Sequence, residues 1–243
     1  MHRIRPGGAA DGIGKGRGNP MSQTAQMLTE ASEEYIEAIY KMSLEGQVIA
    51  ARLAERMKVS PPTVADMLKR LAEKGLVKSS RRDGVKLTKK GLETAEALVR
   101  RHRLWERFLT DVLGLNWDEV HEEACKLEHA MSPQVEVKLA QILGNPETCP
   151  HGYPIPGTRG AKKRAREARP LSSLSVGDEA VIDRVAEEDS QLLQYLATLG
   201  LLPEARVSVK EIAPFKGPML VKVCGAQYAL GQEVASKIMV KGK

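Results

Sequence analysis

The chain has 243 residues, 42% of them hydrophobic but only 4% aromatic, so it can bury aliphatic cores in one to three domains. It has three cysteines, no recognisable signal peptide and no apolar run of about 18 residues, so we expect a cytoplasmic protein without structural disulfides or membrane spans. The net charge of +6 is unevenly placed, because residues 47–91 hold twelve Lys and Arg against four Asp and Glu, a balance of +8. A basic segment of this kind indicates a nucleic-acid partner.

The first helix is expected from Ser32 to Glu45, where apolar residues keep helical spacing until Gly46 ends the run. This helix is acidic, and its residues Glu34 and Glu37 lie about one turn apart. The preceding residues 1–27 are Gly-rich and basic at their start, without periodicity. That composition predicts a disordered tail, in which two internal methionines are alternative translation starts.

Two further short helices predict a helix-turn-helix. The first should cover residues 50–57, and the second should begin after Ser60, an N-cap residue followed by Pro61 at the first helical position. The second helix should continue through Ala72 and end before Gly75. Helices of this length joined by a tight turn are typical of DNA-binding proteins.

A β-hairpin should follow directly. The run "LVKSSRRDGVKLT" alternates apolar and polar residues around Asp83-Gly84, which is a strong hairpin turn signal. It predicts a two-stranded wing that carries Arg81 and Arg82, and we expect both arginines to contact DNA phosphates. Residues 28–91 are therefore interpreted as a winged helix-turn-helix domain.

Beyond the wing, two helices carry residue types that bind metal ions. Thr88 should cap a helix of about 25 residues that ends near Gly114 and holds His102 and Glu106 one turn apart. The segment "NWDEVHEEACKLEHAMS" opens with a capping box and closes at a proline, which predicts one helix of roughly four turns. Four ligand types on it fall within an arc of about 100° and can converge. They are His121, Cys125, Glu128 and His129.

Two motifs nearby have simpler explanations than they first suggest. The string His121-Glu122-x-x-Cys125 resembles the zinc-peptidase motif HExxH but lacks its second histidine, so we do not expect an enzyme. Cys149 and His151 lie two residues apart in a turn-rich segment, without a second ligand pair close in sequence. Structural packing explains this pair better than zinc binding does.

The remainder of the chain predicts a separate β-rich domain. A helix from Pro133 to Gly144 should complete a helical domain over residues 92–156. Residues 157–170 are basic and lack a core, so they are interpreted as a linker. From residue 171 to 243, short β-rich runs separated by glycines indicate a small barrel, with one helix at about 189–199.

Four segments, in order, resemble the diphtheria toxin repressor family of iron- and manganese-dependent regulators: "EEYIEAIY", "RHRLWERFLTDVLGL", "VHEEACKLEHAMS" and "CPHGYPIPG". The part from "LSSLSVGDEAVI" to "ALGQEVASKIMV" is similar to the SH3-like domain shared with ferrous-iron transport accessory proteins. The likeness covers about Ser32 to Val240. It implies a mainly α N-terminal part, a winged helix-turn-helix plus a helical dimerisation domain, followed by a small β-barrel SH3-like domain.

The resemblance also implies two metal ions per subunit. The residues that match the family's primary site are Cys125, Glu128, His129 and, on the first helix, Glu34, with Glu37 one turn later. The residues that match its second site are His102, Glu106 and His121, with Glu187 or Glu188 near the place where the SH3-like domain contributes a ligand.

The ligand types disagree about which metal is bound. Cys125 matches the iron-responsive members, whereas Glu34 and Glu37 match the manganese-responsive branch, which has an acid in place of the cysteine. A thiolate favours iron, cobalt, nickel or zinc, and carboxylates favour harder ions. We expect Fe²⁺, with Mn²⁺ as the alternative.

On the DNA side, the resemblance extends to the second helix of the helix-turn-helix. Ser60, Pro62 and Thr63 match residues at the start of the family's recognition helix, and Arg70 matches a phosphate-contacting arginine. Asp66 stands where some relatives carry a glutamine that approaches a base. A carboxylate can accept a hydrogen bond from cytosine N4 but is repelled by phosphate, so the operator sequence does not transfer.

We therefore expect a homodimeric, metal-activated repressor that binds a palindromic operator and controls metal-homeostasis genes, without an organic cofactor. An ion held by both the first helix and the later helices would fix the separation of the two recognition helices. The main alternative is a metal-storing or metal-delivery protein without specific DNA binding, which the SH3-like domain suggests. A regulator with an organic effector is a further alternative, and it predicts that loss of Cys125 or His129 leaves regulation intact.

Overall fold

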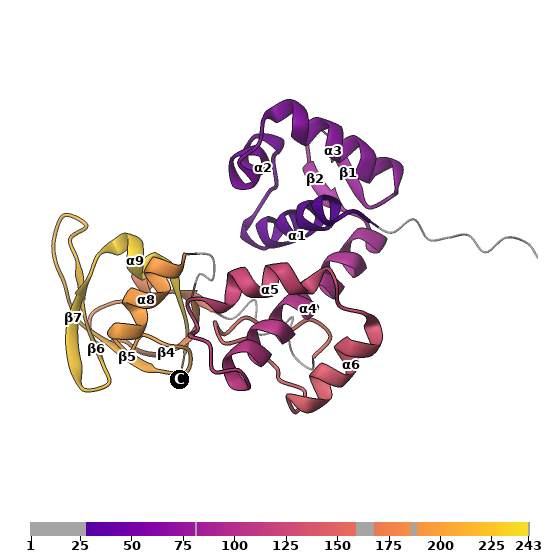
Figure 1. Ribbon diagram of the computed structural model, residues 1–243. Coiled ribbons are helices and arrows are strands. Elements are labelled where there is room, and N and C mark those ends of the chain that lie inside the picture. Colours follow the sequence, from indigo (N-terminus) through magenta and orange to yellow (C-terminus); the bar gives the residue numbers. More distant parts are fainter. Residues whose placement is uncertain (1–27, 81, 159–167, 186–188, 243) are drawn as a thin grey trace, which may run out of the picture.

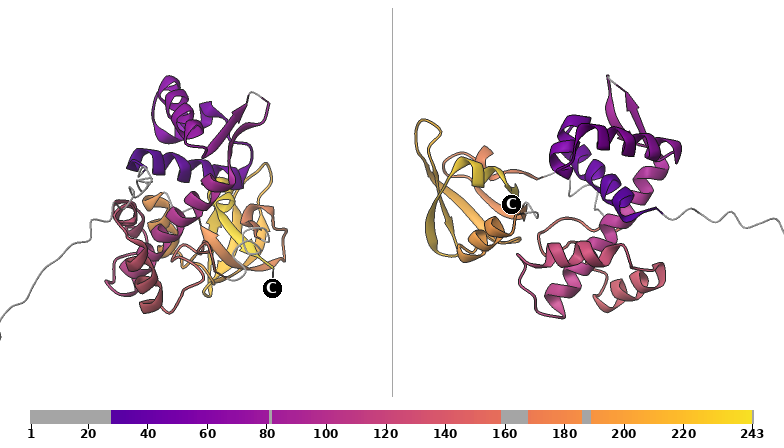
Figure 2. Two further views of the ribbon diagram at one scale, coloured as in Figure 1. Left: turned by 90° about the vertical axis from the view of Figure 1, so that its right-hand side faces the viewer. Right: turned by 45° about the horizontal axis from the view of Figure 1, so that its top comes forward.

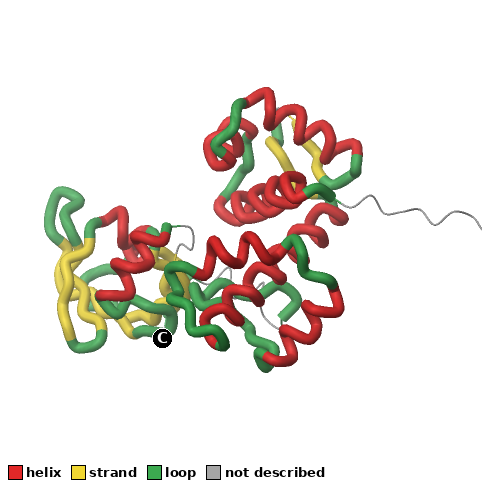
Figure 3. Tube along the Cα trace, viewed as in Figure 1, coloured by secondary structure: helices red, strands yellow, loops and turns green. Residues whose placement is uncertain are grey.

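A computed structural model describes residues 28–80, 82–158, 168–185 and 189–242. These residues form three bodies in chain order, with the helical ones on one side of the molecule and the sheet on the other (Figures 1 and 3). The predicted disordered tail, most of the predicted linker, Arg81, Glu187 and Glu188 lie outside the described residues. Among the described residues, no helix has both the length and the apolar character that crossing a membrane requires.

The first body is the predicted winged helix-turn-helix. Its elements are α1 (Glu30–Glu45), α2 (Ala50–Met57), α3 (Pro61–Glu73), β1 (Val77–Ser80) and β2 (Gly84–Leu87). Side-chain caps start two of the helices, because Thr29 accepts a hydrogen bond from the Ser32 amide and Ser60 accepts one from the Thr63 amide. Lys58, in the left-handed conformation with φ 53°, ends α2 and turns the chain toward α3. The hairpin β1–β2 projects from the helices (Figure 2).

The wing is attached to the chain that follows α1. Val48 pairs with Val85, whose amide donates to the Val48 carbonyl at 2.8 Å, and the Gln47 amide side chain donates to the Arg82 carbonyl at 3.1 Å. A Cβ at Gly84 would collide with the Val48 carbonyl oxygen, so the glycine permits both the turn, at φ +69°, and this close approach. The position of the wing is therefore fixed by backbone contacts.

The second body consists of α4 (Lys89–Asp111), α5 (Val120–Glu128) and α6 (Pro133–Ile142). Helix α4 begins against the first body, where Ala95 joins the core, and continues as the support on which α5 and α6 pack. Helix α5 is shorter than expected. Asn116 does not cap it but donates to the Glu119 carboxylate at 3.2 Å within a turn, and the helix starts at Val120 without a side-chain cap.

The third body is a six-stranded antiparallel sheet with strand order β3-β8-β4-β5-β6-β7. The strands are β3 (Arg169–Pro170), β4 (Glu179–Val185), β5 (Arg206–Ile212), β6 (Met219–Val223), β7 (Ala226–Leu230) and β8 (Ile238–Lys241). The 3-10 turn η1 (Leu171–Ser173) and helices α8 (Ser190–Thr198) and α9 (Gln232–Ser236) complete it. The expected barrel is not closed, because the edge strands β3 and β7 do not pair. Residue periodicity did not predict β8, β3 or α9, which are short.

The segment after α6 connects the second body to the sheet. The Val185 amide of β4 donates to the His151 carbonyl at 3.1 Å, and a Cβ at Gly152 would collide with the Asp183 carbonyl oxygen. Trp117 packs against the core of the third body and stacks on the His151 ring at 5.4 Å between centroids. The third body therefore lies directly against the residues that follow α6.

Candidate metal centre

His102 of α4 lies at the centre of a group of ligand-type side chains. Its Nδ1 is 2.6 Å from Glu128 Oε2, and its Nε2 is 3.1 Å from Glu106 Oε1 and 3.0 Å from His121 Nδ1. Only 1% of His102 is exposed, and Glu106 is fully buried. Because α5 packs along α4, residues separated by up to 26 positions in sequence are brought together here.

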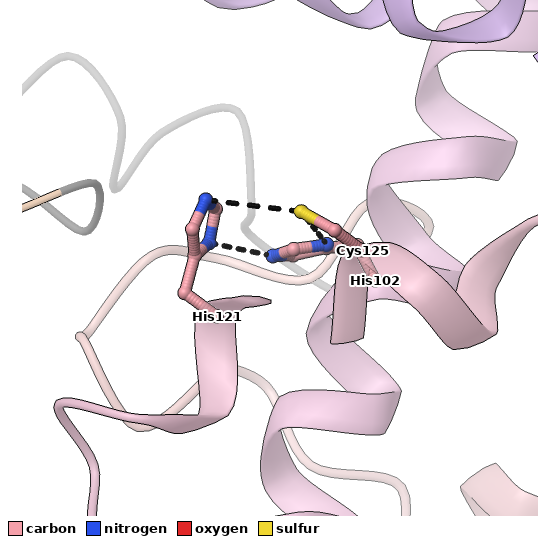
Figure 4. Close-up of side chains that lie close together, drawn as sticks. All are labelled: His102, His121 and Cys125. Atoms are coloured by element: carbon pink, nitrogen blue, oxygen red, sulfur yellow. Dashed lines mark hydrogen bonds between the residues drawn. The ribbon is translucent and has the colours of Figure 1, made fainter. Parts of the chain in front are cut away.

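Cys125 and His121 complete the side of this group that faces solvent. The Cys125 Sγ lies 3.9 Å from His102 Nδ1 and 3.9 Å from His121 Nε2, so the thiol and both rings face one another (Figure 4). His121 and Cys125 are one turn apart on α5, as their spacing predicted. A cluster of two imidazoles and one thiol is a soft-ligand set for a divalent transition metal.

Helix α1 contributes Glu37 to the same group. Ligand atoms of Glu37, His102 and Glu128 lie within 4.8 Å of one another, and all three residues are buried. Glu37 also pairs with Lys41 at 3.1 Å. This contact links the first body to the helical body through side chains of types that can bind cations.

The pKa values of Glu37 and Glu128 are shifted in opposite directions. Burial favours the neutral form of Glu37, but Lys41 and His102 outweigh it and lower the Glu37 pKa to about 2. Burial and the adjacent Glu37 charge together raise the pKa of Glu128 to about 7, despite the hydrogen bond with His102. Without a cation between them, Glu37 is ionised and Glu128 retains its proton close to neutrality.

A buried extension of the group reaches the segment after α6. His151 Nδ1 lies 3.2 Å from Glu106 Oε1, and ligand atoms of Glu106, Cys149 and His151 are all within 4.8 Å of one another. The other ring nitrogen of His151 donates to the Trp117 carbonyl at 2.7 Å. Glu106 Oε2 is buried without a hydrogen-bond partner among the described residues, an arrangement that a cation would satisfy.

A separate group lies at the surface, at the start of α1. Ligand atoms of Glu30, Glu34 and His129 lie within 4.8 Å of one another, and both acids are exposed. His129 Nδ1 is 2.7 Å from Glu33 Oε2, and its Nε2 is 3.5 Å from Glu128 Oε1. His129 therefore stands between this surface group and the buried one.

The thiol of Cys125 and the imidazole of His121 shift each other's pKa values. Burial opposes ionisation of Cys125, but hydrogen bonds with His102 and His121 outweigh it and lower the pKa of the thiol to about 6. Burial also opposes the charged form of His121, yet its bonds with Cys125 and Glu106 raise the pKa of that imidazole to about 9. In the absence of metal, the protonated imidazole of His121 therefore stabilises the Cys125 thiolate and the Glu106 carboxylate. A divalent cation fits this donor set because it can replace the bound protons as the source of positive charge.

The geometry does not follow the two separate sites that the resemblance implied. His102 was expected in the second site, but it contacts residues expected in the primary site as well as residues expected in the second. Of the two acids expected from α1, Glu37 lies in the buried group, whereas Glu34 lies at the surface beside His129. His121 and Cys125 lie in one group with His102, and Glu128 lies in another with Glu37 and His102. His129 contacts Glu33 through one ring nitrogen and Glu128 through the other. Which of these residues bind metal stays a prediction.

The sequence predicted Cys149 and His151 to be packing residues, and it indicated Glu30 and Glu33 only as part of an acidic helix and not as ligands. Cys149 and His151 are packed, with 1% and 0% of their surfaces exposed, but they also face Glu106. Their two-residue spacing was the available signal. Their partner lies more than 40 positions earlier in the chain, so the sequence alone did not identify it.

The expected DNA-contacting residues that the structure describes belong to α3, its N-cap and the wing. Pro62, Thr63, Asp66 and Arg70 are exposed on α3, and Arg82 is exposed on the wing. Ser60 also serves as the N-cap of α3, and its hydroxyl is 2.8 Å from that of Thr63. Contacts of these residues with DNA stay a prediction.

Comparisons with known proteins agree with this architecture. Residues 27–85 match the iron dependent repressor N-terminal DNA binding domain, residues 88–157 the iron dependent repressor metal binding and dimerisation domain, and residues 169–242 the FeoA domain. The chain is 38% identical over 226 residues to the iron-dependent repressor IdeR of Mycobacterium tuberculosis, an alignment covering 88% of this chain and 98% of that protein. The chain belongs to the iron-dependent repressor family.

Other relatives extend the comparison to manganese. The chain is 41% identical over 131 residues to the diphtheria toxin repressor of Corynebacterium diphtheriae, covering 54% of this chain and 58% of that one. A manganese-dependent transcriptional repressor solved in complex with manganese superposes with a TM-score of 0.79 at 36% identity, over 87% of this chain and all of that one. ScaR with bound Cd²⁺ superposes with a TM-score of 0.75 at 30% identity, over 87% of this chain and 99% of that one. The predicted family and mixed fold are confirmed.

Proposed function

We propose that this protein is a metal-activated transcriptional repressor, and that the buried group of Glu37, His102, Glu106, His121, Cys125 and Glu128 is where the metal acts. The observation that carries the proposal is the position of Glu37. It belongs to the DNA-binding body, and it lies within 4.8 Å of ligand atoms on α4 and α5. A ligand set divided between two bodies couples cation binding to their relative placement.

The charges of the buried side chains explain how metal binding changes the relative stability of the two bodies' arrangements. In the metal-free protein, Glu37 and Glu128 face each other, and the raised Glu128 pKa of about 7 reflects the cost of two buried negative charges. A bound divalent cation would supply the positive charge that allows Glu37, Glu128 and Cys125 to be anionic together. Metal binding then stabilises the arrangement in which α1 is held against α4 and α5, relative to other placements of the first body. In a homodimer this fixes the separation of the two α3 helices, which must match successive major grooves of a palindromic operator.

We propose Fe²⁺ as the preferred ion, with Mn²⁺ as an alternative activator. The Cys125 thiol, with its pKa lowered to about 6, is largely thiolate near neutral pH, and a thiolate favours iron over the harder manganese. Glu37 and Glu128 are hard ligands that both ions accept. The buried group has ligand types for more than one ion, since Cys149 and His151 extend it on the far side of Glu106.

We also propose that the helical body forms the homodimer contact. Val112 and Leu113 at the end of α4 and Ile142 at the end of α6 are exposed, Ile142 at 71%, although they belong to the domain that matches the dimerisation family. Exposed apolar side chains mark an interface when they form a contiguous patch, and we propose that the partner subunit covers these residues. Because its partner is chromosomal DNA, the protein is assigned to the cytoplasm.

A binding mode of action, without catalysis, is supported by the position of Glu122. A hydrolase of the HExxH type uses that glutamate as its base beside the metal. Here Glu122 is exposed on α5, and Cys125 stands where that motif has its second histidine.

A DNA-binding titration tests the proposal. Operator fragments are first recovered from genomic DNA with the Mn²⁺-loaded full-length protein, and affinity is then measured with chelator, Mn²⁺ and, anaerobically, Fe²⁺. We expect either ion to strengthen binding at least tenfold, and Glu37→Gln to remove that gain. Glu45→Gln, an exposed acid at the other end of α1, should keep it and is the matched control.

Two outcomes would contradict the proposal. Operator affinity that is the same with chelator and with metal would remove the regulatory role. Tight metal binding without enrichment of any genomic fragment would instead support the storage or delivery alternative.

A further inference from the structure

Asp66 occupies the most outward position of the helix that should enter the DNA groove. The buried face of α3 is defined by Val64, Leu68 and Leu71. At 100° per residue, Asp66 lies roughly 140° to 160° away from each of these three side chains around the helix axis. It therefore stands almost opposite the core, in the first half of α3.

The surroundings of Asp66 are not those of a structural acid. Arg70 is one turn further along and suitably placed for an ion pair, yet Asp66 makes no hydrogen bond or ion pair with any described residue. It is the sole acidic residue between Pro61 and Ala72, in a domain with a strongly basic balance. Nothing in the described structure uses this carboxylate.

A free carboxylate at this position opposes DNA binding unless it contacts a hydrogen-bond donor. Facing phosphate, it would be repelled, and it would offset part of the attraction of Lys69 and Arg70 beside it. The major-groove edges of guanine and thymine present acceptors at O6, N7 and O4, which also repel a carboxylate. Adenine offers a donor at N6 but places the acceptor N7 next to it. Cytosine N4 is a donor without an adjacent acceptor on the same base.

We propose that Asp66 is a specificity-determining residue that selects a cytosine in each half of the operator by accepting a hydrogen bond from its N4 amino group. This inference rests on the proposed DNA-binding function and adds a base preference to it. Phosphate contacts from the wing and from Arg70 hold the helix in place, and Asp66 then discriminates among the bases in front of it. The two copies of α3 in the homodimer place the two cytosines symmetrically about the operator centre.

The experiment is a selection from random-sequence duplexes with full-length, Mn²⁺-loaded protein, carried out in parallel for wild type, Asp66→Asn, Asp66→Ala and the control Glu55→Gln. Asp66→Asn removes the charge and adds a donor, which suits the N6 and N7 pattern of adenine. Glu55, exposed on α2, gives the same change in net charge elsewhere in the domain. Mn²⁺ affinity, measured for each variant, reports that the protein is folded.

We expect one strongly selected cytosine per half-site in wild type and in Glu55→Gln. Replacing that C·G pair should weaken wild-type binding on the order of tenfold per half-site. Asp66→Asn should shift the preference toward adenine, and Asp66→Ala should accept all bases at that position while binding DNA more tightly overall. The inference is overturned if wild type and Asp66→Ala select the same bases at every position, even though both bind DNA in response to metal. Loss of metal-stimulated binding in wild type would contradict the proposed function itself, so the two failures are distinguishable.

Discussion

Two groups of ligand-type side chains join α1 to the helical body, and they differ in their exposure to water. Around His102, Glu37, Glu106 and Glu128 are buried and carry strongly shifted pKa values. Beside His129, Glu30 and Glu34 are exposed at the surface. Solvent screens the surface charges, whereas the buried charges are stabilised only by one another or by a bound cation. The contrast shows that closely spaced ligands are not sufficient for a metal-dependent switch. The ligands must also be buried, because a bound cation then has a large effect on their free energy.

The largest effect should come from removing the centre of the buried group. His102→Ala leaves Glu106 and Glu128 without the imidazole that contacts both, so we expect metal affinity to fall roughly 100-fold or more. The metal-free protein should also lose about 3 kcal/mol of stability, because buried carboxylates are left unpaired. Isothermal titration with Mn²⁺ and chemical unfolding measure the two effects. His2→Ala, outside the described residues, is the control, and a metal response as strong in His102→Ala as in this control would contradict the assignment.

The second prediction uses pH to sharpen the same contrast. His121, with a pKa of about 9, and Glu128, at about 7, hold protons that a metal ion must displace. Metal affinity should therefore rise between pH 6 and pH 8, by up to about tenfold per pH unit for each proton released. Mn²⁺ titrations in buffers of different protonation enthalpy count those protons.

In the metal-free protein, the contribution of His121 to stability should change with pH in the opposite direction. The folded-state pKa of His121 is raised above its ordinary value of 6.5, so its contribution to stability is complete below pH 6.5 and is lost as the pH rises through about 9. Thermal unfolding with and without Mn²⁺ separates the two trends. A metal affinity that does not change with pH would show that these groups are not ligands.

Cys125→Glu tests the soft member of the buried group. Replacing the thiolate by a carboxylate removes the ligand that favours iron and leaves only imidazole and carboxylate donors. We expect the ratio of Fe²⁺ to Mn²⁺ affinity to fall roughly tenfold, with operator binding still activated by Mn²⁺. Competition between the two ions under anaerobic conditions measures the ratio. Cys224→Ser, at an exposed cysteine of the third body, should leave it unchanged.

The smallest effect is expected at the surface group. Glu34→Gln removes an exposed acid from beside His129, and we expect operator binding with metal to change less than about threefold, as is typical of exposed charge pairs. Glu37→Gln, one turn further along the same helix, is the matched buried substitution. If Glu34→Gln is as damaging as Glu37→Gln, the surface group takes part in metal binding, and the distinction between the groups fails.

Much of the fold was predictable because its signals are local. Ser60 before Pro61, Thr88 before the long helix and the Asp83-Gly84 turn each specify a boundary through a neighbouring backbone group, and the structure confirms all three. The length of α5 was predicted wrongly for the same kind of reason. The Glu119 amide donates to the Asn116 carbonyl and closes a turn, while the Asn116 side chain bonds to the Glu119 carboxylate and not to a backbone amide of the helix.

By itself, the sequence determined the winged helix-turn-helix, the long α4 and the pair His121 and Cys125, since helical spacing fixes which residues share a face. Only the tertiary structure decided that Glu37 and not Glu34 is buried, because α4 packs against that side of α1. It also decided that His151 faces Glu106, since the chain after α6 returns to α4. Local backbone geometry extends over a few residues, whereas the partners of a buried charge are set by how whole elements pack.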